Sequence, residues 1–282
     1  MTVMLHEPRT EFVNLAWRDK PLRLEYQWVG AVKSAYPVVV FLHEGLGSIA
    51  LWKDYPQRFC EANGFTGLVF SRYGYGHSTP RPHDERWPVS FMHAQADEVL
   101  PMFFAALGLD KPWLFGHSDG GSISLLHAAH FPDSVSGIAV VAPHIFVEEV
   151  SITSIEQARE TYLSTDFQSK LGRYHADADS AFWGWNNIWL DPAFRSWNIE
   201  NELHNITCPV IAVQGEDDEY GTLEQIRGIQ RKAPQTRLVV LPRCGHSPHR
   251  DQPEALTKEV AEFIQSNTSV IPERHHKQGD KP

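Results

Sequence analysis

Short apolar segments alternate with helical segments along most of this chain, and this alternation limits the fold more than any other feature of the sequence. The run at 38–42, Val-Val-Val-Phe-Leu, is continuously apolar and β-branched, as expected for a strand buried on both faces. Such alternation predicts βαβ units, and therefore an α/β fold with a mostly parallel central sheet flanked by helices. The expected strands are 22–29, 38–42, 67–71, 113–115, 137–142, 210–214 and 237–241, and the expected helices are 52–63, 91–107, 122–129, 223–231 and 253–265.

The alternation stops between residues 144 and 205. This stretch is rich in tryptophan, phenylalanine, tyrosine, asparagine and aspartate, and it contains no strong strand pattern. We therefore expect a core domain formed by 1–143 and 206–266, interrupted by a mainly helical cap at 144–205. The polar segment 267–282 is expected to be a flexible C-terminal tail.

Composition narrows the range of partners. The 282 residues carry a formal net charge of -10, which disfavours nucleic acid as a partner. The apolar runs are too short to cross a membrane, and no export signal precedes the first predicted strand. Three widely spaced cysteines fit free thiols in a cytoplasmic protein. The histidines lack metal-ligand spacing, so no metal site is predicted. The expected partner is a small-molecule substrate, and no organic cofactor is expected.

The sequence Gly116-His117-Ser118-Asp119-Gly120 carries the strongest chemical signal. It follows a predicted strand and precedes a predicted helix, which is the setting of a nucleophile elbow. The two glycines allow a tight turn, which exposes the serine hydroxyl at a helix N-terminus where negative charge is favoured. Ser118 is therefore the candidate nucleophile.

A serine hydroxyl needs a base to remove its proton, and candidates follow two later strands. Gly215-Glu216-Asp217-Asp218 comes after the strand at 210–214, and Gly245-His246-Ser247-Pro248-His249 comes after the strand at 237–241. The order serine, acid, histidine is therefore available at the ends of three strands.

These motifs resemble those of the α/β-hydrolase fold family, and the resemblance covers nearly the whole chain. The family's GxxD pattern implies Asp218 as the acid, with Asp217 and Glu216 as adjacent alternatives. Its glycine-histidine pattern implies His246 as the base, with His249 on an exposed loop as the alternative. The same pattern continues through Asp251, which we expect to cap the last helix.

The resemblance also implies an oxyanion hole made of two backbone amides. One is that of Asp119, and the other comes from the loop His43-Glu44-Gly45-Leu46-Gly47, where Gly45 is the expected donor and Leu46 the alternative. Glu44 replaces a glycine that the family usually has, and its carboxylate either binds a water or polar substrate group or points away. The Asp119 carboxylate either selects an amine or hydroxyl or bonds nearby backbone or a cap residue.

The substrate pocket is expected to combine this loop with the cap. Aromatic side chains above a sheet are suited to lining an apolar pocket, although most are expected to pack the cap onto the core. The candidate substrate-binding residues are Glu44, Leu46, His144, Phe146, Trp185 and Trp189.

The sequence thus predicts a serine hydrolase that cleaves a small carboxylic ester, thioester or lactone through an acyl-serine intermediate. One alternative is a carbon–carbon bond hydrolase for aromatic ring-cleavage products, and another is a non-catalytic binding relative. A peptidase for N-terminal proline is also compatible with the early loop, whereas epoxide and haloalkane hydrolases resemble the chain less because they use an aspartate as nucleophile.

Overall fold

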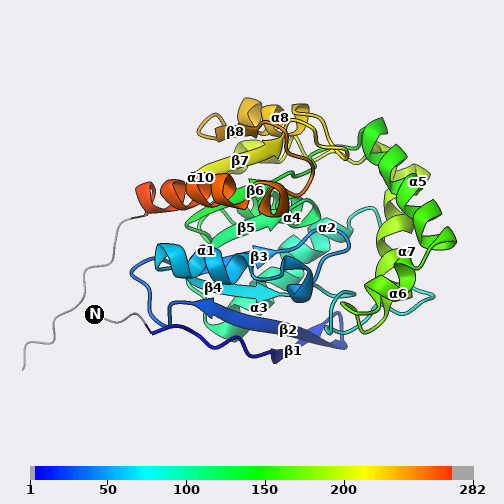
Figure 1. The fold of residues 1–282 in the computed structure, drawn as a ribbon, viewed down its shortest axis with the longest axis horizontal. Helices are drawn as coiled ribbons and strands as arrows, with labels where there is room; N and C mark the ends of the chain where they lie inside the picture. Colours follow the sequence, from blue (N-terminus) through cyan, green and yellow to red (C-terminus); the bar gives the residue numbers. More distant parts are fainter. Residues whose placement is uncertain (1–3, 269–282) are drawn as a thin grey trace, which may run out of the picture.

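The computed structural model describes residues 4–268 and contains one eight-stranded sheet (Figure 1). The strands follow the order β1-β2-β4-β3-β5-β6-β7-β8 across the sheet. Their bounds are β1 Glu11–Trp17, β2 Lys20–Gly30, β3 Val39–Leu42, β4 Thr66–Phe70, β5 Trp113–His117, β6 Gly137–Val141, β7 Val210–Gly215 and β8 Arg237–Leu241.

The pairing is parallel from β4 through β8, and only β1 and β2 join it in antiparallel fashion. The predicted fold class is therefore confirmed. β1 was not expected from the sequence, because the β1–β2 turn is made by Arg18 and Asp19. Both adopt positive φ angles, 52° and 59°, without the glycine or asparagine that usually marks such a turn.

Two helical layers cover the sheet. α1 (Tyr55–Asn63) and α10 (Pro253–Ser266) lie on one face, and α3 (Leu100–Leu107), α4 (Asp119–His130) and α8 (Glu224–Lys232) lie on the other (Figure 1). Successive strand residues point to opposite faces, and in β3, β4, β5, β6 and β7 the residues on both faces are buried. This explains the continuously apolar runs in the sequence.

The predicted helix at 91–107 is one helical segment with an irregular middle. α2 (Phe91–Ala94) leads into a π-helical turn at Gln95–Val99, which is followed directly by α3. The wide turn lies just before Pro101, which has no N–H to donate to the preceding turn. The irregularity is therefore placed where the proline requires it.

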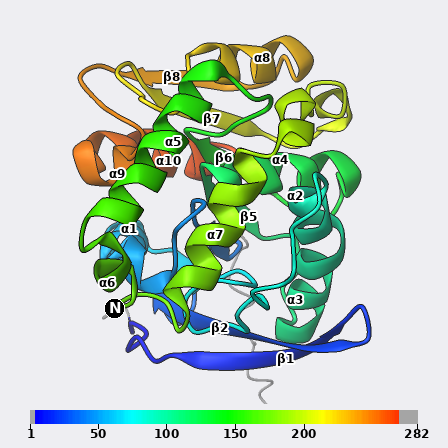
Figure 2. The same cartoon turned by 90° about the vertical axis from the view of Figure 1, so that its right-hand side faces the viewer.

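The cap helices lie over one end of the sheet, as Figures 1 and 2 show. They are α5 (Glu149–Ser164), α6 (Phe167–Leu171) and α7 (Ala178–Trp189), and all three fall between β6 and β7 in the chain. Short 3₁₀ turns at Pro192–Ser196 and Leu203–Asn205 return the chain to the sheet. The predicted tail at 267–282 falls outside the described residues beyond 268.

The start of the last helix differs from expectation in one respect. Asp251 does not cap α10 but ends the short helix α9 (Pro248–Asp251), and its Oδ2 accepts a hydrogen bond from the Gly245 amide at 2.9 Å. The carboxylate thereby fixes the loop that carries the candidate base.

Among the helices within residues 4–268, none is long and apolar enough to cross a membrane.

Candidate active site

Ser118 lies at a sharp turn between β5 and α4. Its φ angle is 52°, and the turn brings the flanking backbone very close together. A Cβ on Gly116 would lie 2.3 Å from the Gly120 carbonyl oxygen, and a Cβ on Gly120 would lie 2.2 Å from the Leu42 oxygen. Only glycine fits at these two positions, which accounts for the motif.

Ser118, His246 and Asp218 form one chain of hydrogen bonds. His246 Nδ1 lies 2.8 Å from Asp218 Oδ1, and His246 Nε2 lies 2.9 Å from Ser118 Oγ. Because a carboxylate only accepts, the imidazole proton resides on Nδ1 and the Nε2 lone pair faces the serine hydroxyl. The arrangement suits removal of the hydroxyl proton by His246.

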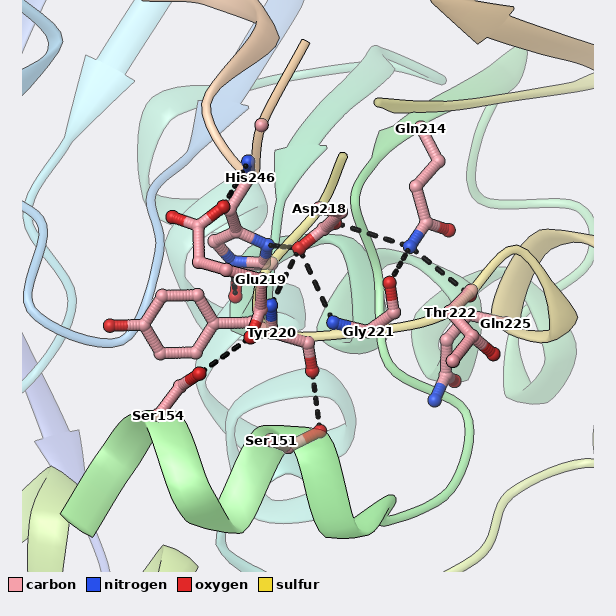
Figure 3. A network of polar contacts seen from close by, with 12 residues as sticks. Ser151, Ser154, Gln214, Asp218, Glu219, Tyr220, Gly221, Thr222, Gln225 and His246 are labelled. Atoms are coloured by element: carbon pink, nitrogen blue, oxygen red, sulfur yellow. Dashed lines mark hydrogen bonds and ion pairs between the residues drawn. The ribbon is translucent and has the colours of Figure 1, made fainter. Parts of the chain in front are cut away.

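Asp218 is held by a network of donors, shown in Figure 3. Its Oδ1 also accepts hydrogen bonds from the Tyr220 amide at 2.8 Å and the Gly221 amide at 3.3 Å, and its Oδ2 accepts one from Gln214 Nε2 at 3.1 Å. Burial would raise the pKa of Asp218, but the charge and hydrogen bond of His246 outweigh burial and lower it. Asp218 therefore remains ionised beside the imidazole.

The adjacent carboxylates do not share this position. Glu216 and Asp217 are exposed, and neither has a side-chain contact with His246. Of the three alternatives in the sequence, the structure brings only Asp218 into contact with the histidine ring.

The pKa of His246 reflects opposing influences. Burial disfavours the imidazolium, but the charge and hydrogen bond of Asp218, assisted by Glu219 and Glu44, raise the pKa above its ordinary value of 6.5. The surroundings therefore stabilise the charged ring that forms when His246 takes a proton from Ser118.

The expectation that His249 lies on an exposed loop is wrong. The side chain is buried, with its ring centroid 4.8 Å from that of Trp52 and 4.9 Å from that of His117. Burial and the proximity of His117 lower its pKa to about 2. Pro248 begins α9 and turns His249 inward, so it packs behind the site and makes no hydrogen bond to Ser118.

The two predicted oxyanion donors meet at the same cavity. Gly45, Leu46 and Asp119 all line it beside Ser118. Within the described residues, the Gly45 and Asp119 amides donate no hydrogen bond to another protein group. The loop carrying Gly45 is anchored by His43, whose Nδ1 donates to the Glu44 carbonyl at 2.7 Å and whose Nε2 accepts from the Arg72 amide at 2.9 Å.

The cavity has a volume of about 260 Å³ and lies between loops of the core and helices of the cap. The cap contributes an apolar wall, with the Trp185 indole packed against Gly45. The side chains lining the cavity include the predicted Glu44, Leu46, His144, Trp185 and Trp189, together with Ile155, Ala158, Phe167, Glu219 and Tyr220.

Phe146 does not line this cavity, so its assignment to the substrate pocket is wrong. It forms an isolated β-bridge with Asn198 and lines a separate surface hollow with Arg195 and Glu200. The chain leaving β6 passes the cavity at His144 and then buries Ile145, which carries Phe146 away from Ser118.

The Asp119 carboxylate is engaged within the protein. Its Oδ1 accepts a hydrogen bond from Trp189 Nε1 at 3.3 Å, and its Oδ2 lies 3.8 Å from Arg72 Nη2. Burial raises the pKa of Asp119 to about 6, although Arg72 and Trp189 oppose this shift. Asp119 therefore bonds a cap residue, one of the two roles that the sequence left open.

Glu219 and Tyr220 were not selected from the sequence. Glu219 Oε2 accepts a hydrogen bond from the His246 amide at 3.1 Å, and the Tyr220 ring centroid lies 4.7 Å from that of His246. Their positions immediately after Asp218 are the only sequence signal, because a loop that delivers the acid also brings its next residues to the same place.

Comparison with known proteins identifies the family to which this fold belongs. A sequence model described as the alpha/beta hydrolase fold matches residues 37–187. The chain belongs to this family. It is 24% identical over 213 residues to the serine hydrolase BPHL of Homo sapiens, covering 71% of this chain and 70% of that protein.

Two further similarities span most of the molecule. The chain is 22% identical over 253 residues to a 2-hydroxy-6-oxo-6-phenylhexa-2,4-dienoate hydrolase of Burkholderia cepacia, covering 80% of this chain and 87% of that protein. The crystal structure of VinJ superposes with a TM-score of 0.72 at 22% identity, covering 92% of this chain and 99% of the other. BPHL and the dienoate hydrolase are hydrolases by name, and the likeness to the VinJ structure covers most of this alpha/beta hydrolase fold.

Proposed function

We propose that this alpha/beta hydrolase is a serine hydrolase that cleaves small carboxylic esters, or the related thioesters and lactones. The observation that carries the proposal is the continuous chain of hydrogen bonds from Ser118 through His246 to Asp218. The candidate oxyanion donors line the same cavity, so a carbonyl could be held against the serine.

The mechanism follows from these contacts. Ser118 Oγ attacks the ester carbonyl carbon while its proton passes to His246 Nε2, and the Gly45 and Asp119 amides hold the oxyanion. The tetrahedral intermediate collapses, the C–O bond to the leaving group breaks, and His246 gives its proton to the departing oxygen. A water molecule then attacks the acyl carbon while His246 Nε2 takes its proton. The C–O bond to Ser118 breaks, His246 gives the proton to Ser118 Oγ, and the carboxylic acid is released.

The cavity limits the substrate in size and charge. Its volume of about 260 Å³ suits a small acyl group, and the cap side is lined by Ile155, Phe167 and Trp185. Three carboxylates, those of Glu44, Asp119 and Glu219, face or border the cavity, and its described lining includes no lysine or arginine. These features support a neutral or cationic ester with an apolar acyl portion.

The same charges bear on the alternative of carbon–carbon bond hydrolysis. A ring-cleavage dienoate carries a carboxylate, and a carboxylate placed in this cavity would meet like charges with no cation lining the walls. Arg72 and Arg250 lie behind the lining and are directed at Asp119 and Glu44, respectively. The electrostatics therefore favour the ester over the dienoate.

The test compares three substrates under the same conditions. Wild-type protein should hydrolyse p-nitrophenyl acetate and butyrate, and Ser118→Ala should abolish turnover. A phenyl-substituted hydroxy-oxo-dienoate should react far more slowly than butyrate. Faster cleavage of the dienoate would favour the carbon–carbon hydrolase, and unchanged nitrophenol release by Ser118→Ala would exclude Ser118 as the nucleophile.

A further inference from the structure

The His117 side chain, directly before the nucleophile, lies between the loop that carries Glu44 and the backbone of His246. Its Nε2 lies 2.7 Å from the main-chain oxygen of His246, and its side chain is almost fully buried. Because a carbonyl oxygen only accepts, His117 Nε2 carries a proton and donates it. The ring of His117 therefore holds the backbone of His246.

The opposite nitrogen of the same ring faces a carboxylate. His117 Nδ1 lies 3.5 Å from Glu44 Oε2, and within the described residues it has no hydrogen-bond partner. Glu44 Oε1 in turn lies 3.7 Å from Arg250 Nη2. Burial would raise the pKa of Glu44, but the contact and charge of His117 lower it well below its ordinary value, so the carboxylate is ionised.

The contact from His117 completes the support of His246. The His246 amide donates to Glu219 Oε2, its carbonyl accepts from His117, and its two ring nitrogens contact Asp218 and Ser118. A shift of the His246 backbone would move Nε2 away from Ser118 Oγ, and displacements of this kind reduce catalysis steeply.

We propose that Glu44 and His117 form a positioning pair, in which the Glu44 carboxylate sets the orientation of the His117 ring and His117 fixes the His246 backbone. The inference rests on the proposed function, because it assigns the pair to the base of that mechanism. The buried ring has two orientations differing by a half-turn. Both facing oxygens only accept, so the carboxylate favours the orientation that presents an N–H at both ends, whereas the half-turn would present C–H groups there. The other groups facing His117 are the rings of His246 and His249, with centroids at 5.2 Å and 4.9 Å, and Trp52.

The first experiment removes the donor. His117→Leu should lower kcat for p-nitrophenyl butyrate by about 10- to 100-fold with little change in KM, since the misplaced base affects the transition state. His117→Gln should restore kcat to within about threefold of wild type, because its amide nitrogen reaches a position similar to Nε2. Failure of His117→Gln to rescue a folded His117→Leu defect would overturn the proposal.

His127 offers a matched control. It is equally buried, and its Nδ1 contacts a backbone carbonyl, that of Ala96, at 2.8 Å, but it lies on the distant part of α4. His127→Leu should lower the melting temperature much as His117→Leu does and leave kcat unchanged. An equal loss of kcat in both leucine variants would mean that the effect is general destabilisation, and the proposal would fail.

The second experiment asks whether Glu44 acts through His117. Glu44→Gln should lower kcat by about 5- to 10-fold, and the loss should largely disappear when His117 is already leucine, because two residues acting through one contact are not additive. Independent multiplication of the two losses would refute the pair. A change confined to KM that depends on substrate charge would instead assign Glu44 to substrate binding and would also refute it.

The positioning role of Glu44 and His117 can be tested even if the proposed ester hydrolysis is wrong. If the wild type cleaves no ester, the function is wrong, but the same variants can be compared by the rate at which diisopropyl fluorophosphate labels Ser118, followed by mass spectrometry. This labelling needs the Ser118–His246 contact and not the natural substrate. Equal labelling rates for wild type, His117→Leu and Glu44→Gln would overturn the positioning role on their own.

Discussion

Asp218→Asn removes a negative charge from the triad while keeping nearly the same size. Asp218 Oδ1 lies 2.8 Å from His246 Nδ1. With charge centres about 4 Å apart and an effective dielectric constant of about 20, the carboxylate stabilises the imidazolium by about 4 kcal/mol. We therefore expect kcat to fall about 10³-fold. KM should change little, because Asp218 is behind the histidine and does not line the cavity.

The surrounding donors make the substitution more harmful. Asp218 Oδ2 accepts from Gln214 Nε2, whose position is fixed because it also donates to the carbonyls of Gly221 and Thr222 at 2.8 Å and 3.1 Å. A new amide group would set its NH₂ either against Gln214 or against the proton on His246 Nδ1. In the second orientation the amide NH₂ donates to Nδ1, so the ring proton moves to Nε2 and the imidazole is in the wrong tautomer to accept the Ser118 proton.

The assay is the hydrolysis of p-nitrophenyl butyrate at pH 7.5, with circular dichroism to verify folding. Asp217→Asn is the matched control, since Asp217 is exposed, lies one residue away, and should tolerate the change with full activity. Retention of more than about a tenth of wild-type kcat by Asp218→Asn would refute the charge argument. Loss of activity in Asp217→Asn alone would point to the other carboxylate.

Three other predictions follow from the site. Because the pKa of His246 is raised above 6.5 and the ring must be neutral to accept a proton, the acid limb of kcat/KM should lie above pH 6.5; a limb well below that value would contradict this. Arg72→Met should lower the free energy of unfolding in urea by about 3 kcal/mol, because the buried Asp119 carboxylate loses its cation. Adding Asp119→Asn should recover most of that loss, and no recovery would contradict the ion pair's role. Trp185→Ala should raise KM for p-nitrophenyl butyrate, whereas Phe146→Ala should not; equal effects would contradict the cavity boundary.

Much of the core could be predicted because its strands are buried on both faces. The runs around Val40, Val140 and Val213 are apolar at consecutive positions, and each pairs in the parallel sheet as expected. β1 was missed because its signal is weak: the strand is exposed along one face, and its turn at Arg18 and Asp19 lacks the usual residues.

The triad was predictable for a different reason. Glycines that no other residue can replace mark the serine turn, and the acid and histidine follow strand ends in a fixed order. The failures concern side-chain direction, which local sequence does not encode. Phe146 and His249 are each close in sequence to a site residue, yet Phe146 bridges to Asn198 and lines a different hollow, and the His249 ring packs near Trp52.

The place of Glu219 after Asp218 puts it near the site, but the contact partners of Glu219 and of Glu44 could not have been predicted from their neighbours in the chain. Each depends on a loop from another part of the sequence reaching His246 or His117 in three dimensions. Glu44 stood out only as an unexpected residue in a loop where glycine is usual. The unusual residue marks the loop as distinctive, but its contact with His117 is visible only in the structure.

The backbone of Ser118 has a consequence for attempts to make this protein more heat-resistant. A residue with a side chain pays roughly 1–3 kcal/mol to occupy a conformation of this kind, whereas glycine adopts it freely. Screening for thermal tolerance alone would therefore favour glycine at the very residue whose hydroxyl is needed. Selection for thermal stability favours glycine at position 118, whereas selection for turnover requires serine. A screen for stabilised variants should therefore also measure catalytic activity.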